Sequence, residues 1–396
     1  MKNIGVFFGS RSTEHDISII TGEFIISGLK KLGYEATPIY INREGEWMIG
    51  GGLDKLSVFI DPETERKTLA DEGYKSYFID LKSSRGKIVF RKKGVFGKKI
   101  TIDLAFPAFH GAYGEDGTIQ GLFEMLDVPY VGCNVPSSAI SMDKAFTKQI
   151  CSSDGIPVVK SVAFNDSEWN SEKDKIIKKI GELKYPLFVK PVHGGSSIGI
   201  SKVKEADNDL HDKIEVALHY DNKVIVEEGV PNLMDVTCCI IGNDELHASL
   251  LQEAIFQADL FDFEEKYLKD GGSQLGKSES GIVIPARVSD EKKKEIQDMA
   301  KAAYRAIGCS GIARIDFLLN KESGELFMNE INPLPGTLYH HLWQEEGIKF
   351  EELLTKLIGF AEERYQNKKK IFYGFKSSVL TSLNSTKFKS SKLGKL

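Results

Sequence analysis

The stretch FMNEINPLPGTLYHHLW, residues 327–343, begins as an apolar run and continues into two prolines, two histidines and a tryptophan. Glu330 and Asn332 lie inside a segment that otherwise has the pattern of a buried strand. A carboxylate or an amide that faces a dry interior costs several kcal/mol unless it is paired or ligates a metal. We therefore expect a functional site at the end of this strand.

A second alternating strand, ARIDFLL at residues 313–319, places Arg314 and Asp316 on one face, and NEIN does the same for Glu330 and Asn332. If the two strands pair as a hairpin, these four polar side chains converge. Two carboxylates and an amide oxygen are hard ligands that suit magnesium, and Arg314 would stabilise negative charge that develops during a reaction. A solvated outer face of a hairpin would alternate in the same way, but the apolar neighbours favour a metal site.

Composition limits the remaining possibilities. A chain of 396 residues that is 41% hydrophobic and 28% charged can form two or three domains with full cores. Its net charge of -5 gives no general basis for binding nucleic acid, and no apolar run approaches the roughly 20 residues that span a bilayer. The first residues lack the pattern of a secretory signal, so we expect a cytoplasmic location. The five cysteines form no CxxC pair and indicate neither disulfides nor zinc.

Short β-branched runs alternate with helical patterns along the chain. A strand, a helix and a second strand over residues 3–41 indicate an α/β domain, which residues 44–100 elaborate. A helix at about 135–154 begins a second region, and longer strands with a helix at about 289–307 form a third region from 231 onward. We expect an α/β and α+β protein. The lysine- and serine-rich residues 366–396 have the composition of a poorly ordered tail.

A glycine- and serine-rich stretch, FVKPVHGGSSIGISKV at residues 188–203, follows a strand that ends near Lys190. Small residues let backbone N–H groups approach and cradle a phosphate, and a lysine adds a point charge. The spacing is neither that of a P-loop nor that of a dinucleotide-binding turn, so a glycine-rich hairpin turn stays open as the alternative. Lys144 in SMDKAFTK is a second candidate cation, although alone it would be typical of a surface lysine.

Four separated stretches then match one family in order: GSRSTEHDIS at 9–18, HGAYGEDGTIQG at 110–121, VKPVHGGSSIG at 189–199, and ARIDF at 313–317 with NEINPLPG at 329–336. Together with SMDKAFTK and FDFEEKYL they make the chain resemble the D-alanine–D-alanine ligases of the ATP-grasp superfamily, over about residues 1–365. The resemblance implies a three-domain ATP-grasp architecture with an N-terminal Rossmann-like α/β domain. It also implies an ATP-dependent ligase that makes the terminal dipeptide of peptidoglycan precursors, acts on small molecules only, and forms a homodimer.

The resemblance divides the chain into four parts. Residues 1–132 would form the N-terminal substrate domain, 133–230 the central ATP-grasp subdomain, and 231–365 the C-terminal subdomain. Within the last of these, residues 256–280 would be a lid that excludes water from the reaction. Residues 366–396 would form a flexible basic tail.

For the amino-acid substrates, the resemblance implies that Glu14 holds the ammonium group of the first D-alanine and that His110 lies near the reacting groups. Ser196 would link Glu14 to Tyr267 on the lid. Arg314 and the backbone N–H near Gly336 would stabilise a tetrahedral oxyanion. A glutamate at the start of a helix is also favoured by the helix dipole, so Glu14 has a structural explanation as well.

For ATP and metal, the implied ligands are of two kinds. Lysines and a serine would contact the phosphates, and acidic residues would contact adenine and ribose; the set is Lys144, Lys190, Ser197, Glu227, Glu228, Asp235 and Lys266. Asp235 stands where the family usually has a longer glutamate. Two Mg²⁺ or Mn²⁺ ions would be held by Asp316, Glu330 and Asn332. ATP would convert the first D-alanine to an acyl phosphate, which the amine of the second then attacks.

The acceptor side departs from the family pattern. Pro333, Leu338 and His341 stand where the family has Thr, Thr and Ser, and we expect His341 and Leu342 to contact the substrate. The acceptor would be D-alanine or another small D-amino acid such as D-serine, whereas the retained Tyr267 disfavours D-lactate. An unperturbed histidine has a pKa of about 6.5, so His341 would make acceptor use depend on pH near neutrality.

Three alternatives remain open at this point. The adjacent histidines 340 and 341 would have no contact with substrate if they only pack or cap a turn. Another ATP-grasp ligase or a carboxylase would share the lysines and the Asp, Glu and Asn set, but would not need STEHDIS and EKY. A non-catalytic nucleotide-binding regulator would be expected to have lost a metal ligand, and none is missing.

Overall fold

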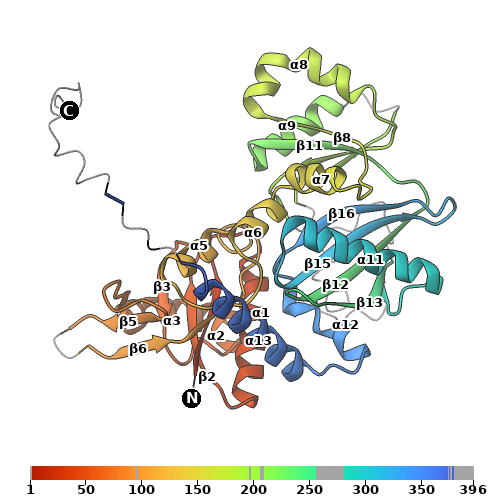
Figure 1. Cartoon of the computed structure of the whole chain (residues 1–396). Coiled ribbons are helices and arrows are strands. Elements are labelled where there is room, and N and C mark those ends of the chain that lie inside the picture. The colour runs from red at the N-terminus through yellow and green to blue at the C-terminus, as the bar shows by residue number, and fades with distance from the viewer. Residues whose placement is uncertain are drawn as a thin grey trace.

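The computed structural model describes residues 2–94, 97–195, 198–205, 209–255 and 281–372, together with 374, 377 and 378. In this part of the chain the strands form four sheets, which lie in an N-terminal body, a smaller lobe and a body built from the C-terminal strands (Figure 1). None of the described helices combines the length and the apolar composition needed to cross a bilayer.

The N-terminal sheet has the strand order β3-β2-β1-β7. The expected strand, helix, strand start is confirmed, because β1 pairs in parallel with both β2 and β7. Every residue of β1 is buried, which explains its continuous apolar run. The elements are β1 (Asn3–Gly9), α1 (His15–Lys31), β2 (Glu35–Ile41), β3 (Trp47–Ile49), β7 (Leu104–Pro107) and α5 (Thr118–Met125).

The insertion between β3 and β7 folds as short helices and a separate antiparallel sheet in the order β4-β5-β6. Asp61 and Asp71 cap the second and third of these helices by accepting backbone N–H groups, which is why the polar segment can form helix at all. The elements are α2 (Ser57–Ile60), α3 (Pro62–Ala70), α4 (Glu72–Lys75), β4 (Tyr77–Ile79), β5 (Ile88–Lys92) and β6 (Lys99–Ile102).

The expected single helix at 135–154 is two helices, α6 (Val135–Met142) and α7 (Lys144–Ser153). Asp143 interrupts them with extended backbone angles, φ -92° and ψ 100°. Its side chain accepts a hydrogen bond from the Phe146 N–H at 2.8 Å and so caps the second helix. The break turns Lys144 into the first residue of α7.

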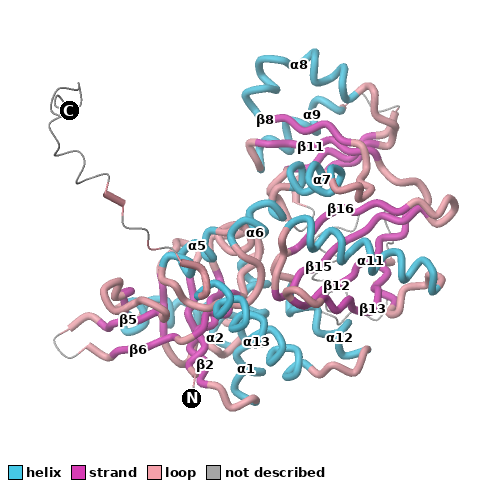
Figure 2. The backbone as a smooth tube through the Cα atoms, viewed as in Figure 1, coloured by secondary structure: helices cyan, strands magenta, loops and turns pink. Residues whose placement is uncertain are grey.

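The small lobe contains a four-stranded sheet in the order β10-β9-β11-β8, with α8 and α9 packed on it (Figures 1 and 2). A capping box between Asn165 and Glu168 starts α8, and Trp169 on its first turns is buried in the core of the lobe. The elements are β8 (Ser161–Asn165), α8 (Asp166–Ile180), β9 (Leu187–Pro191), β10 (Ser201–Val203), α9 (Leu210–Tyr220) and β11 (Lys223–Glu228).

The largest sheet has the order β14-β13-β12-β15-β16. One face packs under α11, while the other joins the core of α1, α12 and α13, so that adjacent Cys238 and Cys239 belong to different cores. The elements are β12 (Leu233–Gly242), β13 (Leu246–Ala254), β14 (Ile282–Val283), α11 (Asp290–Ile307), β15 (Gly311–Asn320), β16 (Leu326–Asn332), the 3-10 helix η3 (Gly336–Tyr339), α12 (His340–Glu345) and α13 (Phe350–Lys369). Residues 366–369 of the expected tail are therefore helical.

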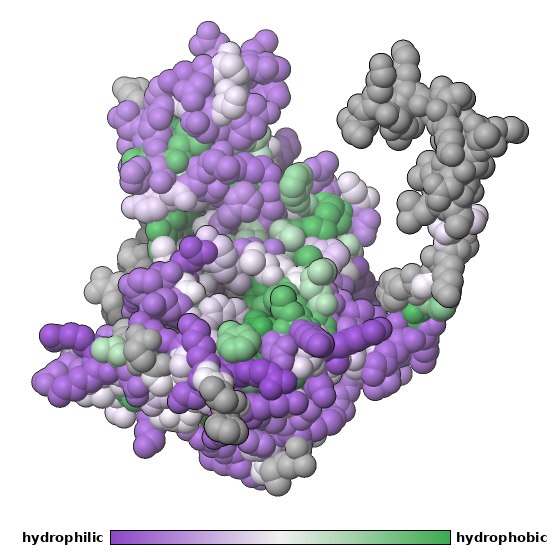
Figure 3. Space-filling view, turned by 90° about the vertical axis from the view of Figure 1, so that its left-hand side faces the viewer, coloured by the Kyte–Doolittle hydropathy of each residue, from purple (hydrophilic) through white to green (hydrophobic). Residues whose placement is uncertain are grey.

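Much of the visible surface is hydrophilic, and apolar residues gather in the middle of the face seen in Figure 3. The cores lie inside the bodies: the largest fully buried side chains include Trp169, Trp343, Tyr40 and Tyr304. Burial of such apolar area is the main source of stability in a chain of this size.

Arg364 of α13 joins three distant segments. One guanidinium nitrogen donates to Tyr130 O at 2.8 Å and another donates to Gly132 O and Ser310 Oγ. The guanidinium carbon also lies 4.4 Å from the centre of the Tyr130 ring. The last helix is thereby fixed to the segment that leaves the N-terminal sheet.

We predict that Arg364→Met lowers the free energy of unfolding by about 2 kcal/mol, because the methionine keeps the apolar stem but leaves carbonyl oxygens without their charged donor. Urea unfolding followed by circular dichroism measures the change. Arg305→Met, at an exposed position of α11, is the control and should stay within about 0.5 kcal/mol of the parent. Equal effects of the two substitutions would contradict the proposed bridging contribution of Arg364.

Candidate active site

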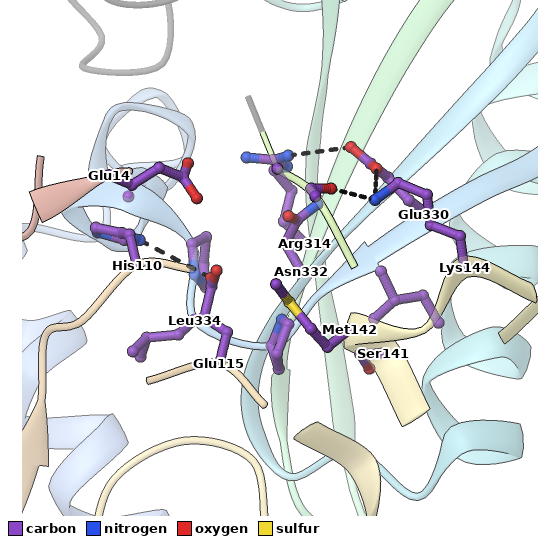
Figure 4. A pocket seen from close by; sticks show the side chains of 16 residues that line it. Glu14, His110, Glu115, Ser141, Met142, Lys144, Arg314, Glu330, Asn332 and Leu334 are labelled. Atoms are coloured by element: carbon purple, nitrogen blue, oxygen red, sulfur yellow. Dashed lines mark hydrogen bonds and ion pairs between the residues drawn. The ribbon is translucent and has the colours of Figure 1, made fainter. Parts of the chain in front are cut away.

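A pocket of about 50 Å³ lies between the N-terminal body and the end of the β15–β16 hairpin. Figure 4 shows Glu14, His110 and Glu115 on one side of this pocket and Arg314, Glu330 and Lys144 on the other. Of the residues predicted from sequence, those that line it are Glu14, His110, Lys144, Arg314, Glu330, Asn332 and Gly336. Four stretches that are far apart in the sequence therefore meet at one place.

The predicted hairpin is confirmed. β15 and β16 pair antiparallel, with Arg314 opposite Asn332 and Asp316 opposite Glu330. The Arg314 guanidinium donates to Asp316 through Nε at 3.0 Å and Nη2 at 2.7 Å, and its Nη2 lies 3.8 Å from Glu330 Oε1. A register shift follows Asp316, so the pairing that aligns these polar residues ends just before the apolar part of the strands.

The charged side chains of this cluster alter one another's pKa values. Burial and the neighbouring Glu330 carboxylate raise the pKa of Asp316, although Arg314 opposes them. The chemistry of the donors fits a divalent ion, because two carboxylates and the Asn332 carboxamide are hard oxygen ligands. Asn332 Nδ2 donates to Asp316 Oδ2 at 3.2 Å, which leaves the amide oxygen directed elsewhere. No group of three or more His, Cys, Asp or Glu side chains that could hold a metal ion occurs in the described ranges, so a metal here depends on Asn332 as the third ligand.

Two predicted lysines lie on different elements, and only Lys144 lines the pocket among the described residues. Lys144 Nζ donates to Gly194 O at 2.5 Å and lies 3.8 Å from Glu330 Oε2, which places the ammonium group between the glycine-rich stretch and the β16 carboxylate. Lys190, at the end of β9, donates to Glu227 Oε2 at 2.6 Å. Positive charge is therefore concentrated where the sequence predicts phosphate.

Lys148 is a buried cation that the sequence analysis did not single out. It lies one helical turn after Lys144, and its Nζ is 3.2 Å from Glu227 Oε1. Burial lowers the pKa of Lys148, whereas Glu227 opposes the shift. Burial also disfavours the ionised form of Glu227, but the two ammonium groups lower its pKa to about 2. The i, i+4 spacing of the two lysines was the signal that could have revealed this contact.

Two other predicted ATP contacts, Glu228 and Asp235, lie on β11 and β12. Glu228 accepts a hydrogen bond from the Lys184 N–H at 3.0 Å. Asp235 lies on β12 opposite Leu318 of β15. Neither residue, nor Lys190 or Glu227, is among the described side chains that line the pocket. Ser196, Ser197, Lys266, Tyr267 and the expected lid at 256–280 lie outside the described residues.

His193 holds the start of the glycine-rich stretch from two sides. Its Nδ1 lies 3.0 Å from Asp221 Oδ2 and its Nε2 lies 3.4 Å from Asp143 Oδ2, while its backbone N–H also donates to Asp221. Lys223 Nζ donates to the same Asp143 oxygen at 2.6 Å. The hydrogen bonds to Asp143 and Asp221 raise the pKa of His193 to about 9, so the imidazole is positively charged at neutral pH.

On the opposite wall, Glu14 is the N-cap residue of α1 and is buried. His110 Nδ1 lies 3.8 Å from Glu115 Oε1, and Glu115 accepts the Gly111 N–H at 2.7 Å. Burial raises the pKa of Glu115, and the nearby Glu14 carboxylate adds to the shift. Glu115 is part of HGAYGEDGTIQG, but only the three-dimensional structure places its carboxylate in the pocket.

The acceptor segment corrects two expectations. Leu342 is fully buried in the core shared with α1 and α13 and does not line the pocket. His341 Nε2 lies 2.7 Å from Gln252 Oε1, and burial lowers its pKa to about 3. The predicted pH dependence of His341 near neutrality is therefore wrong, because the imidazole stays neutral there. The expectation assumed an unperturbed pKa, and burial is not visible in the local sequence.

The comparisons with known proteins agree with this geometry. Family models described as the N-terminus and the C-terminus of D-ala D-ala ligase match residues 3–133 and 150–359. A D-alanine–D-alanine ligase of Thermosipho melanesiensis is 39% identical, with 93% of this chain and 96% of that protein covered. A ligase of the same name from Macrococcus caseolyticus is 38% identical, with 94% and 98% covered.

Two solved structures are similar over nearly the whole chain. The VanG D-Ala:D-Ser ligase from Enterococcus faecalis has a TM-score of 0.76 and 34% identity, with 91% of this chain and 99% of that chain covered. The D-alanine–D-alanine ligase from Coxiella burnetii has a TM-score of 0.76 and 29% identity, with 93% and 96% covered. The fold and the site define an ATP-dependent ligase with the ATP-grasp fold. The chain belongs to the D-alanine–D-alanine ligase family.

We predict that His193 stabilises the folded protein below about pH 9. The pKa of about 9 in the folded state exceeds the unfolded value of about 6.5, so the contribution is complete below pH 6.5 and disappears above pH 9. We expect about 1 kcal/mol, because the imidazole is 43% exposed and solvent screens its ion pairs.

The measurement compares the parent with His193→Gln at pH 6 and at pH 10 by thermal unfolding. The parent should be the more stable protein at pH 6 and should lose that advantage at pH 10. His219→Gln, on the exposed side of α9, is the matched control. An advantage that persists unchanged at pH 10 would show that the charge of His193 does not stabilise the fold.

Proposed function

We propose that this chain joins two D-alanines through a D-alanyl phosphate intermediate, with ATP as the energy source, for peptidoglycan precursor synthesis. The observation that carries the proposal is the convergence of Arg314, Asp316, Glu330 and Asn332 with Lys144, in a pocket whose other wall holds Glu14 and His110. On one side of the pocket, cationic side chains suit a nucleotide phosphate, and carboxylate and amide oxygens suit its metal ion. On the other side, an anionic wall suits an ammonium group.

In the first step the carboxylate of D-alanine attacks the terminal phosphorus of ATP and ADP leaves. Lys144 and Lys190 offset the charge of the triphosphate, and Glu14 holds the substrate ammonium. Bound Mg²⁺ or Mn²⁺, as two ions at Asp316, Glu330 and Asn332, supplies further charge neutralisation. Ser197, Lys266, Glu227, Glu228 and Asp235 complete the proposed nucleotide contacts.

In the second step the amine of the acceptor attacks the acyl carbon, a C–N bond forms, and the acyl C–O bond to phosphate breaks. Arg314 and the Gly336 N–H stabilise the tetrahedral oxyanion before phosphate leaves. Because water would hydrolyse the acyl phosphate, we propose that residues 256–280 act as a lid, fixed by Tyr267, Ser196 and Glu14. We also propose the domain boundaries given above, a homodimer, and a cytoplasmic location where ATP is available.

A second candidate acceptor is D-serine. Two observations favour keeping it: the departure at Pro333, Leu338 and His341, and the similarity to a D-Ala:D-Ser ligase structure.

The test of function supplies labelled D-alanine and ATP with a panel of acceptors, namely D-alanine, D-serine, L-alanine and D-lactate. We expect ADP release only with D-alanine present, and a D-alanyl-D-alanine product by mass spectrometry. Predominant D-alanyl-D-serine would establish the second candidate. A product that contains no D-alanine would refute the substrate assignment, whichever nucleotide is hydrolysed.

We predict that Glu330→Gln lowers kcat about 100-fold and raises the magnesium concentration needed for half-maximal activity, because the amide keeps the shape but removes one ligand charge. Titrating Mg²⁺ against ADP release measures both effects. Glu322→Gln, in the exposed turn between β15 and β16, is the control and should behave as the parent. Full magnesium-dependent activity in Glu330→Gln would rule out Glu330 as a metal ligand.

A further inference from the structure

Thr21 lies on α1, outside every motif that the sequence analysis used, and its side chain is fully buried. Its Oγ1 is 2.9 Å from His110 Nε2 and 3.2 Å from the backbone nitrogen of Thr337. One hydroxyl group thereby connects a histidine of the pocket wall with the residue that directly follows Gly336.

The Thr337 N–H can only donate, whereas the direction of the Thr21–His110 hydrogen bond depends on the tautomer of His110. The Thr337 N–H donates to Thr21 Oγ1, so the single hydroxyl proton of Thr21 is available for His110 Nε2. An imidazole that accepts at Nε2 carries its proton on Nδ1 when it is neutral. That proton faces Glu115, whose Oε1 is 3.8 Å from Nδ1. A Thr21 hydroxyl that donates to Nε2 would hold His110 as the Nδ1–H tautomer as well as fix its position.

The segment that Thr21 holds has a costly backbone. Thr337, Leu338 and Tyr339 have φ angles of 46°, 57° and 48°, a left-handed run without any glycine. Each such residue costs roughly 1–2 kcal/mol, and the conformation persists only where the surroundings determine it. Thr337 Oγ1 is also buried without a hydrogen-bond partner in the described part of the chain. The segment needs external restraints to keep this shape.

Helix α1 supplies two of these restraints on successive turns. Thr21 accepts the first N–H of the left-handed run, and the ring of Phe24 lies 4.6 Å from that of His340, just after the run. On the opposite side the Tyr339 ring lies 5.0 Å from the Arg314 guanidinium carbon. The corner at Gly336 is thus held between the N-terminal helix and the arginine of the β15–β16 hairpin.

We infer that Thr21 is a positioning residue for the second half-reaction, in which its hydroxyl fixes the Gly336–Thr337 corner and His110 around the acceptor. The inference rests on the proposed two-step ligation. In that step the acyl phosphate reacts with an amine to give the peptide bond, phosphate and a proton. If water attacks instead, the products are the free carboxylate and phosphate, and ATP is consumed without ligation. If the Gly336–Thr337 segment is displaced, attack by the amine becomes slower, whereas hydrolysis of the acyl phosphate continues.

The test compares Thr21→Val, which keeps the shape and removes the hydroxyl, with Thr21→Ser, which keeps the hydroxyl. The quantity measured is dipeptide formed per ADP released without ligation, which is total ADP minus dipeptide, because this ratio compares ligation with hydrolysis and does not depend on the fraction of folded enzyme. We expect the ratio to fall about fivefold in Thr21→Val, as for the loss of one buried hydrogen bond of about 1 kcal/mol, with the KM for ATP unchanged. Thr21→Ser should restore the ratio.

Thr37→Val is the matched control. Thr37 is also a buried threonine, but it lies on β2 and donates to Asn3 Oδ1, away from the pocket. An unchanged ratio in Thr21→Val overturns the inference, and so does equal impairment in Thr21→Val and Thr21→Ser, which would indicate packing alone.

The tautomer of His110 gives a readout that does not depend on the reaction. Nitrogen NMR of the parent, with His110→Gln to assign the signal, should show a proton on Nδ1 of neutral His110, and Thr21→Val should shift the population toward Nε2–H. Identical spectra would overturn the inference. A parent enzyme that releases no ADP with D-alanine would refute the proposed function separately, and the spectra would still decide the contact.

Discussion

The buried ion pair between Arg314 and Asp316 is the constraint on which the rest of the site depends. Both side chains are at least nine-tenths buried, so each charge is tolerable only while the other is present. They lie two residues apart on β15, and the pairing with β16 brings Glu330 and Asn332 beside them. Because a shift of one residue would turn the two polar side chains of one strand away from the two on the other, the hairpin register and the site geometry are the same requirement.

Positive charge at the start of α7 then balances the acidic end of the hairpin. Lys144 reaches Glu330 because Asp143 breaks the preceding helix and starts α7 at that lysine. The same Asp143 carboxylate receives His193 and Lys223, which fixes the glycine-rich stretch against the helix start. Asp143 therefore has two functions: it caps the backbone N–H groups at the start of α7, and it positions the proposed phosphate-binding elements relative to each other.

Local pattern was sufficient for some of this and insufficient for the rest. Strand alternation predicted the convergence of Arg314, Asp316, Glu330 and Asn332, because a period of two residues needs no knowledge of distant segments. The position of Thr21 depends on contacts with His110 and Thr337, which are 89 and 316 positions away, and a single sequence has no signal for contacts at that separation. The pKa of His341 was mispredicted for the same reason, since burial is a property of the packed chain.

The two sides of the pocket differ in how their residues are held. The ATP side is built into strands, so a substitution at Asp316 or Glu330 would disturb buried charges and register together. The acceptor segment after Gly336 is held from outside, by Thr21 and Phe24 of α1 and by the Arg314–Tyr339 contact. Side chains of that segment can change without altering the β15–β16 pairing. Acceptor preference can therefore change while the pairing that aligns Arg314, Asp316, Glu330 and Asn332 stays the same.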